Sequence, residues 1–474
     1  MFLTAVGVTP AAASVNVQRI YGTDAVGTSM VISQQEFPTA GSAKAVVLAD
    51  TGTFSDAIAG GPLAAYEHGP LLLTPAANAS PCSTVTNPST GALTSSDQTT
   101  AYGGVNYYGC SLDSRVATEI ERVLPIGGTV YVLGGPVALN PEIYAALAML
   151  GCYNSNGKLV ACAYNVPMGA SGPLLAGTNL WTTAVDIANA MGSYPTTIFE
   201  ATGLTPYDAL SAVPAAVVNH GVILYTNGST QDTEAGGTAS YLAAHPGDTR
   251  YAIGGPLAAY GADPSAIPVY GQDLYGTSVA VATTFFPNAT TFGATSDWLD
   301  AASGGPFMGS SFLLAGSIKS PGPMLLVPQS APISASVESY LTLTAPTQGY
   351  LFGGPLAAGN DVQSALGSSP TLFSGTFQSN QTGCAALGQG LVCSQLENGS
   401  YDVPRDSGYS ATRSLGATAL GRGPPTALSL VGAQPVRPPT RPAKLPRTWT
   451  RFRRHFSWSP RLSGCRRATA LNSS

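Results

Sequence analysis

The segments SDAIAGGPLAA (residues 55–65), YDALSAVPAAV (residues 207–217) and LDAASGGPFMG (residues 299–309) are three copies of one pattern. In every copy a Pro follows six residues after an Asp, and these Asp residues are Asp56, Asp208 and Asp300. The corresponding prolines are Pro62, Pro214 and Pro306. Self-similarity of this kind indicates repeated structural units that pack against one another.

Three further motifs accompany each copy in the same order. A Gly-polar-Asp/Asn-x-x-x-Thr segment comes first, beginning at Gly22, Gly177 and Gly271. An apolar segment follows the Asp pattern and reads PLLLTP from Pro70, GVILYT from Gly221 and PMLLVP from Pro323. An apolar-Gly-Gly-Pro turn closes each copy, with the glycines Gly134 and Gly135, Gly254 and Gly255, and Gly353 and Gly354. Four motifs in one order, three times, define three repeats.

Strand and helix signals alternate within each repeat. KAVVLAD from Lys44 is an apolar, β-branched run that predicts a buried strand. The following segment predicts a helix to about Glu67, with Asp56 as its N-cap and Gly69 as its left-handed stop. Asp208 and Asp300 are expected to cap the equivalent helices, and the three prolines to bend or break them. Apolar strands alternating with helices predict an α/β fold with parallel sheets covered on both faces.

Motif spacing predicts the domain organisation. We expect repeat one at residues 18–165 with a polar insertion at 76–110, repeat two at 166–267 and repeat three at 268–370. Residues 1–17 resemble the end of a secretory signal peptide, with Ala11 and Ala13 at a cleavage site. Residues 371–400 are predicted to be a linker, and 401–474 a disordered tail rich in Pro and Arg.

Charge is scarce and unevenly distributed. Charged residues make up 9% of the chain, against about 25% in typical soluble domains. The tail holds 13 of the 20 Lys and Arg residues and 2 of the 25 Asp and Glu residues, so residues 1–400 carry a net charge of −16. Attachment to an anionic polymer and a shifted reading frame are both compatible with the tail. We predict no nucleic-acid partner, and no membrane span because no further run of 18 apolar residues occurs.

Six of the seven cysteines form local pairs. They predict the disulfides Cys82–Cys110, Cys152–Cys162 and Cys384–Cys393, as expected of an exported protein, with free core thiols as the alternative. None of these pairs has the spacing of metal ligands, so we predict no metal and no cofactor. His68 and His220 occupy equivalent positions at a helix end, which favours a structural role over a catalytic one.

No established catalytic motif is present in the sequence. In principle, the three motif Asp residues could pair as the catalytic acid and base of a glycosidase. Their triplication at predicted helix starts favours helix caps or ligand contacts instead. The sequence therefore predicts a protein without enzymatic activity.

Taken together, the motifs resemble those of the cell wall-binding repeat 2 family, found as three tandem copies in surface proteins of Gram-positive bacteria. The resemblance covers about residues 18–367. The family's opening motif is matched by Arg19, Ile20, Gly22, Asp24 and Thr28. Its second Arg is replaced by Ala25, Leu180 and Leu274 in the three copies, so a neutral glycan, a divalent-cation bridge or a protein lattice becomes more plausible than a polyanion.

This resemblance implies three Rossmann-like units in a pseudo-threefold cluster, held at the bacterial surface by a secondary cell wall polymer. It also implies candidate polymer-binding residues in the opening and Pro-Ile-Leu-Leu motifs. These candidates are Arg19, Asp24, Pro70, Leu71, Leu72, Leu73, Val222, Ile223, Leu224, Pro323, Met324, Leu325 and Leu326. The expected function is non-catalytic attachment of a secreted protein to cell wall polysaccharide.

Two other functions compete with this one. A structural surface-layer or adhesion protein would use its repeats to bind other proteins, and the polar insertion favours that hypothesis. A wall hydrolase would need a catalytic domain outside the repeats, and neither 371–400 nor the tail is large enough.

Overall fold

A computed structural model describes residues 14–76, 112–139, 143–148, 150–167, 174–314 and 316–368. It also describes the backbone of short strands at 85–86, 93–94, 100–102, 105–107, 384–387 and 390–393. Residues 1–13 of the predicted signal peptide, the Cys82–Cys110 disulfide, the side chains of the Cys384–Cys393 pair and the tail at 401–474 lie outside the described residues. Residues 14–17 of that predicted segment are described, and Asn16 and Val17 belong to the first strand.

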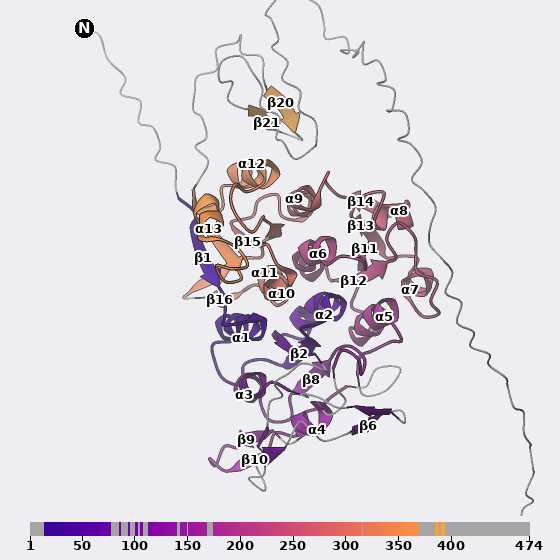
Figure 1. Ribbon diagram of the computed structural model, residues 1–474, viewed down its shortest axis with the longest axis vertical. Coiled ribbons are helices and arrows are strands. Elements are labelled where there is room, and N and C mark those ends of the chain that lie inside the picture. Colours follow the sequence, from indigo (N-terminus) through magenta and orange to yellow (C-terminus); the bar gives the residue numbers. More distant parts are fainter. Residues whose placement is uncertain are drawn as a thin grey trace, which may run out of the picture. The chain divides into compact units, whose positions relative to one another are not determined.

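Three parallel sheets form the frame of the molecule, one for each repeat (Figure 1). In sheet order, the first contains β3 (Leu71–Thr74), β2 (Ala45–Asp50) and β8 (Thr129–Val132). The second contains β12 (Gly221–Thr226), β11 (Thr197–Thr202), β13 (Thr249–Ile253) and β14 (Ile267–Val269). The third contains β18 (Met324–Leu326), β15 (Thr291–Thr295), β19 (Gln348–Phe352) and β1 (Asn16–Ile20). These sheets confirm the predicted α/β fold.

The sheets are interleaved, because the segment that opens each repeat pairs with the last strand of another. β14 precedes the opening motif of repeat three and pairs in parallel with β13 of repeat two. Leu175 precedes the opening motif of repeat two and bridges to Leu133, just beyond β8. β1 precedes the opening motif of repeat one and pairs with β19 of repeat three over its whole length. The N-terminal strand thus closes the three repeats into a ring.

Helices cover the sheets and occupy the spaces between them. In chain order they are α1 (Ala25–Glu36), α2 (Phe54–Tyr66), α3 (Ser114–Val123), α4 (Ile143–Ala148), α5 (Leu180–Ala190), α6 (Tyr207–Val218), α7 (Thr238–Ala244), α8 (Ala259–Ala262), α9 (Leu274–Phe285), α10 (Trp298–Ala301), α11 (Gly304–Gly309), α12 (Ala335–Thr344) and α13 (Asn360–Gly367). Predicted helix starts and strand positions agree with these bounds to within a few residues.

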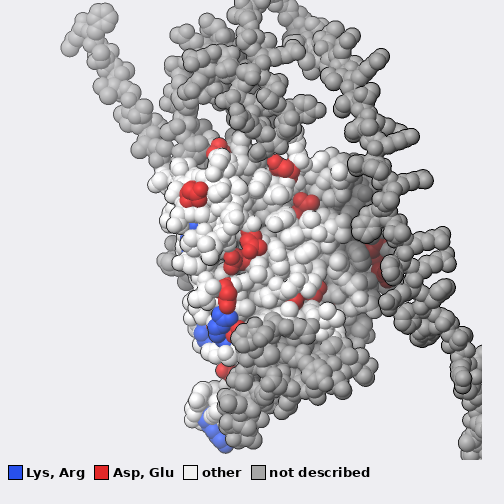
Figure 2. Space-filling model, in the orientation of Figure 1, with Lys and Arg blue, Asp and Glu red and all other residues white. Residues whose placement is uncertain are grey.

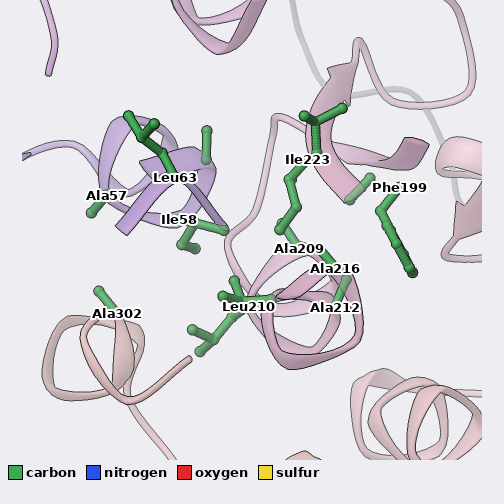
Figure 3. Packing of buried hydrophobic residues seen from close by; sticks show 14 of the residues in the cluster. Ala57, Ile58, Leu63, Phe199, Ala209, Leu210, Ala212, Ala216, Ile223 and Ala302 are labelled. Carbon is green, nitrogen blue, oxygen red and sulfur yellow. The ribbon is translucent and has the colours of Figure 1, made fainter. Parts of the chain in front are cut away.

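The Asp patterns form the helices α2, α6 and α11, which pack against one another at the centre of the ring. Small side chains allow this close approach. A Cβ at Gly61 or at Gly305 would lie 2.6 Å from Val213 Cγ1, so neither position accommodates a larger residue. Alanines of the three Asp patterns, including Ala57, Ala209 and Ala302, are fully buried in this core (Figure 3).

The prolines have different effects in the three copies. Pro62 and Pro214 lie inside the continuous helices α2 and α6, where each leaves one carbonyl without its intrahelical donor. In the third copy the helix is divided into α10 and α11, and Pro306 lies in the first turn of α11. The expected break therefore occurs in one of the three copies.

The end of α2 differs from the prediction. His68, with φ of 53°, is the left-handed residue, and His220 has φ of 52° in the second copy. Gly69 is needed for another reason, since a Cβ there would lie 1.9 Å from the carbonyl oxygen of Ala45. The sequence correctly located the stop but assigned it to the wrong residue.

Short antiparallel hairpins extend from this frame. β4 (Val85–Thr86) pairs with β5 (Leu93–Thr94), and β6 (Thr100–Tyr102) with β7 (Val105–Tyr107), within the predicted insertion. β9 (Gly151–Tyr153) pairs with β10 (Leu159–Ala161), and β16 (Phe312–Leu314) with β17 (Ser317–Lys319). β20 (Cys384–Leu387) and β21 (Gly390–Cys393) form a further pair.

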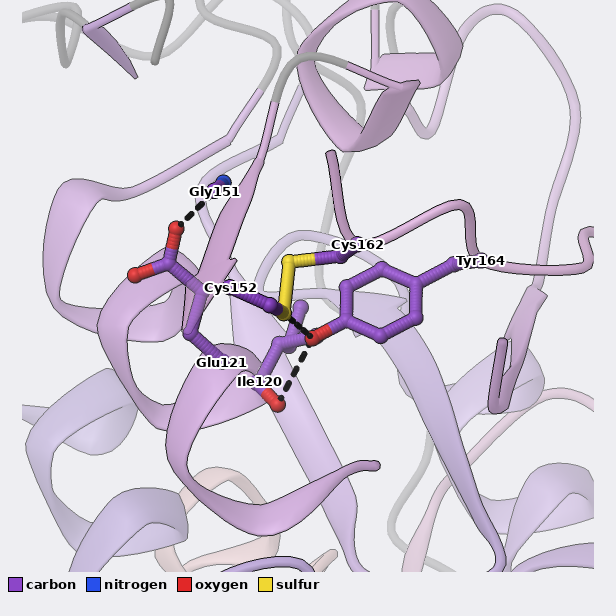
Figure 4. The surroundings of a disulfide bond; sticks show 6 residues. All are labelled: Ile120, Glu121, Gly151, Cys152, Cys162 and Tyr164. Carbon is purple, nitrogen blue, oxygen red and sulfur yellow. Dashed lines mark hydrogen bonds between the residues drawn. A yellow bond between two sulfur atoms is a disulfide. The ribbon is translucent and has the colours of Figure 1, made fainter. Parts of the chain in front are cut away.

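One predicted disulfide lies among the described residues and is confirmed. Cys152 on β9 is bonded to Cys162, just after β10, so the bond joins the two strands at their base (Figure 4). Tyr164 lies beside the bond and donates a hydrogen bond of 3.3 Å to the carbonyl oxygen of Ile120. Gly151 N donates to Glu121 Oε1 at 3.1 Å. The hairpin is thereby tied to α3.

The central contact predicts the effect of enlarging one of its glycines. Gly305→Ala should lower the free energy of unfolding by a net of about 1–2 kcal/mol, because overpacking outweighs the helix preference of Ala. Val213 Cβ itself would lie 2.8 Å from the new methyl group, so rotation of the valine cannot relieve the clash. Denaturant titration of the purified protein measures this change.

Val213→Ala removes the two Cγ atoms that the new methyl group meets, so it should cost less stability in Gly305→Ala than in wild type. Gly247→Ala is the matched control, since a Cβ at Gly247 meets nothing within 4 Å. Additive effects of the two central substitutions would contradict the close contact.

Candidate functional site

The carboxyl edge of each sheet brings the motif Asp against the Gly-Gly turn of the same repeat. A Cβ at Gly134 would lie 2.4 Å from Asp56 Oδ2, one at Gly254 2.6 Å from Asp208 Oδ2, and one at Gly353 2.9 Å from Asp300 Oδ2. These glycines also have φ of 89°, 110° and 105°, a region that other residues rarely adopt. The turn therefore requires glycine for both space and conformation.

The motif Asp residues do not cap their helices, so that prediction is wrong. Asp56, Asp208 and Asp300 lie within the first helical turn, and the N-cap positions belong to Thr53, Pro206 and Asp297. Within the first turn a carboxyl group still faces the positive end of the helix dipole. Its side chain points toward the Gly-Gly turn and fills the space that the missing Cβ leaves.

Capping belongs instead to the opening motif of each repeat. Asp24 Oδ1 accepts a hydrogen bond of 2.7 Å from Gly27 N, and Asp273 Oδ1 accepts one of 2.6 Å from Gly276 N. Asn179 and Thr182 form a reciprocal capping box at the start of α5. The motif Thr accepts a hydrogen bond from the motif Gly in all three copies. Asp24, predicted as a polymer contact, thus has a structural role and is also paired with Arg115 at 2.9 Å.

Arg19 joins the first repeat to the third. Its guanidinium donates to the carbonyl oxygens of Gly353 at 2.9 Å, Ala358 at 2.8 Å and Gly359 at 3.0 Å, and to Gln363 Oε1 at 3.0 Å. Nearby, Thr28 Oγ1 donates to Asp300 Oδ1 at 2.8 Å. The donors of Arg19 are therefore used to hold β1 and the Gly-Gly turn of repeat three together.

The predicted apolar candidates lie in the strands and face the core. Among them, Leu71 and Leu72 in β3, Ile223 in β12 and Leu325 in β18 are 0–1% exposed. Pro70 and Pro323, which precede β3 and β18, are buried as well. The remaining members of the set are also buried: Leu73, Val222, Leu224, Met324 and Leu326.

Exposed apolar side chains mark the same edges, and the sequence analysis missed them. The residue after each Gly-Gly-Pro turn is 84–91% exposed, and these residues are Val137, Leu257 and Leu356. Tyr21 and Tyr270, 48% and 39% exposed, follow β1 and β14 and lie against Gly354 and Gly255. In the first repeat the equivalent position holds Ala176. We call Tyr21, Tyr270, Val137, Leu257 and Leu356 the edge residues.

A cavity of about 130 Å³ lies at the carboxyl edge of the third sheet. Its lining includes Thr295 and Leu326, the last residues of β15 and β18, and Pro328 and Gln329 beyond them. Tyr207 of α6 and the first turn of α9 complete it. Strand ends and a helix N-terminus at a parallel sheet edge are where α/β folds bind ligands.

Burial controls the ionisation of the motif Asp residues. It raises the pKa of Asp56 to about 7, an effect that the charge of Asp50 strengthens and the Ser55 hydroxyl opposes. It raises the pKa of Asp208 to about 6. It also raises the pKa of Asp300, against the hydrogen bond from Thr28. Asp56 and Asp208 are therefore largely neutral in the folded protein under mildly acidic conditions.

The described residues contain no group of three or more His, Cys, Asp and Glu side chains that could hold a metal ion. Nor does that part of the chain contain a helix long and apolar enough to cross a membrane. Basic side chains are few on the face shown in Figure 2, where acidic ones are spread among uncharged residues.

Comparison with known proteins agrees with this architecture. The sequence profile of cell wall binding domain 2 (CWB2) matches residues 19–144 and 175–259. Cwp6 from Clostridium difficile has a similar structure, with a TM-score of 0.54 and 19% identity over 77% of this chain and 50% of its own. Cwp8 from Clostridium difficile gives a TM-score of 0.54 and 19% identity over 74% of this chain and 51% of its own.

The chain thus spans about half the length of these two solved structures, and at this identity the likeness concerns the fold. No protein with a curated description shows significant sequence similarity to it.

The buried carboxyl of Asp56 predicts a pH dependence of stability. Its pKa of about 7 in the folded protein exceeds the value of about 4 in an unfolded chain, so folding takes up a proton between these pH values. The contribution of the protonated Asp56 to the free energy of unfolding is therefore complete below about pH 4, and it is lost as the pH rises through about 7. Asp56→Asn should reduce the fall in unfolding free energy between pH 5 and pH 8 by about 1–3 kcal/mol.

Denaturant titrations at the two pH values measure this difference. Asp361→Asn is the control, since the pKa of this exposed carboxyl is lowered by backbone hydrogen bonds and it stays ionised across the range. An Asp56→Asn protein with the full wild-type pH dependence would refute the assignment.

Proposed function

Because residues 19–144 and 175–259 belong to the cell wall binding domain 2 family, we propose that the protein attaches non-covalently to a cell wall glycan. The observation that carries this proposal is the threefold recurrence of one edge, in which a buried or half-buried Asp, a Gly-Gly turn and an exposed aliphatic residue meet. Repeat three lies outside the matched residues but has the same strand order and the same edge.

The chemistry of the edge residues favours an uncharged polymer. Tyrosine rings and aliphatic side chains offer apolar surface to the C–H faces of sugar rings. Arg19 is used inside the protein, and the family's second Arg is absent from all three copies. A neutral glycan therefore suits these edges better than a polyanion.

Repetition supports attachment to a polymer rather than to a single small molecule. Three weak sites on one rigid ring gain affinity together, because the second and third contacts are intramolecular. Tyr270 and Tyr21 offer a sugar ring an aromatic surface at the edges of repeats two and three. At the edge of repeat one Ala176 takes this position, so the exposed apolar contact there is Val137 alone.

We assign no catalytic role to the motif Asp residues. Asp56 is 5% exposed and packed against Gly134, which leaves no room for a glycosidic bond beside its carboxyl group. Attachment without catalysis, by a secreted protein held at the cell wall, is the simplest function for such an edge.

A structural surface protein is the second candidate. Leu313 and Ile318 are paired across the β16–β17 hairpin and are 63% and 77% exposed. An apolar pair on a projecting hairpin suits contact with another protein, such as a neighbour in a surface layer.

Wall sedimentation tests the proposed attachment. Tyr21→Ala and Tyr270→Ala should each weaken association with purified wall about 2- to 10-fold, since an aromatic contact contributes about 0.5–1.5 kcal/mol. The double variant should lose more than either single variant, because avidity requires several contacts.

Tyr153→Ala is the control, because Tyr153 is 74% exposed but lies on the β9–β10 hairpin. A folded double variant that sediments like wild type would show that the glycan is bound elsewhere.

A further inference from the structure

A second cavity, of about 230 Å³, lies where the three central helices end. Its lining combines Tyr66 of α2, Val217 of α6 and Gly309 of α11, and so draws on all three repeats. Each central helix runs from the carboxyl edge of its sheet to the opposite edge. Gly69 and Gly221, which follow α2 and α6, lie beside Ala45 and Thr197, the first residues of β2 and β11. This axial cavity is therefore at the opposite edge of the sheets from the edge residues.

The electrostatics of the axial cavity favour a cation. Helix C-termini carry partial negative charge, and those of α2, α6 and α11 meet at this point. Among the described residues that line it, none is Lys, Arg, Asp or Glu. Lys319 meets the carbonyl groups at the end of α11, whereas no lysine or arginine among the described lining residues offsets the ends of α2 and α6.

Aromatic rings line the same space. Tyr66 and Tyr194 have ring centroids 4.4 Å apart, and Tyr194 and His220 have centroids 4.7 Å apart. This row of rings crosses from repeat one to repeat two. Aromatic faces attract ammonium groups, most strongly where water is partly excluded.

Lys319 makes contacts of this kind next to the cavity. Its Nζ donates to the carbonyl oxygens of Met308 at 3.1 Å, Ser310 at 3.0 Å and Ser320 at 3.2 Å. It also lies 5.2 Å from the centroid of the Phe307 ring. Three carbonyl acceptors match the three donors of an ammonium group. Lys319 comes from the hairpin inserted in repeat three, and repeats one and two have no such insertion, since Gly69 and Gly221 follow the helix ends directly.

Two strained histidines complete the cavity wall. His68 and His220 have φ of 53° and 52°, a backbone conformation that is unfavourable for residues other than glycine. Within the described part of the chain, no hydrogen bond joins either imidazole to another residue. Glycine would suit both backbone conformations better, so the local fold does not require these imidazole side chains.

We propose that the axial cavity binds a small organic ammonium ion, such as the amine of an amino sugar, with its charge near the helix ends and its body against the tyrosines. The volume suits one sugar ring, since cavities for larger ligands exceed about 300 Å³. This binding is separate from attachment of the wall glycan at the carboxyl edges.

Calorimetric titration of the full chain with glucosamine tests the proposal, with N-acetylglucosamine as the uncharged analogue. Glucosamine should bind at least about 10-fold more tightly, because acetylation removes the charge that the helix ends and rings attract. Equal affinity for the two sugars, or no binding of glucosamine, would overturn the proposal.

Substitutions locate the site. Ser311→Lys, at an exposed residue of the cavity wall, would supply a tethered ammonium and should abolish glucosamine binding, whereas Ser311→Met should not. Tyr194→Leu should weaken binding about 3- to 10-fold, and Tyr153→Leu on the distant hairpin should leave it unchanged. Glucosamine binding that survives Ser311→Lys would exclude this cavity. Wall sedimentation of Ser311→Lys should equal that of wild type, which separates this proposal from the attachment function.

Discussion

Close packing of α2, α6 and α11 is the constraint on which the rest of the structure depends. Gly61 and Gly305 approach Val213 from two sides, and a methyl group at either glycine would separate the helices. Because α2, α6 and α10, which leads into α11, begin beside the Gly-Gly turns of their repeats, this contact fixes three carboxyl edges with respect to one another. It also brings the three helix C-termini to a single cavity. Both proposed binding sites are consequences of one helix contact.

Exchange of strands makes the repeats dependent on each other. The edge of the third sheet is built from the turn at Gly353 and the opening motif at Gly22. This opening motif follows β1, the N-terminal strand, which pairs with β19 of repeat three. The same arrangement joins repeat two to repeat three through β14. An isolated repeat would lack one wall of its own site, so attachment and ring closure are properties of the whole assembly.

Sequence patterns predicted the repeats, the parallel sheets, the buried apolar strands and the Cys152–Cys162 disulfide, because each follows from local periodicity or spacing. The role of Asp56 was not predictable in this way. Its position in the first turn and its contact with Gly134 depend on how a distant turn packs against the helix. Tyr21 and Leu356 were missed because exposure is decided by tertiary structure, although the apolar residue after each Gly-Gly-Pro turn was a visible signal.

The central functional claim is that three linked edges bind one polymer. Its most direct test is the affinity of the intact protein for purified wall-glycan fragments of increasing length, measured by calorimetry. The account predicts that affinity rises at least about 100-fold between a fragment that fills one edge and fragments long enough to reach all three. An affinity that is the same for short and long fragments, once corrected for the number of repeating units, would contradict it.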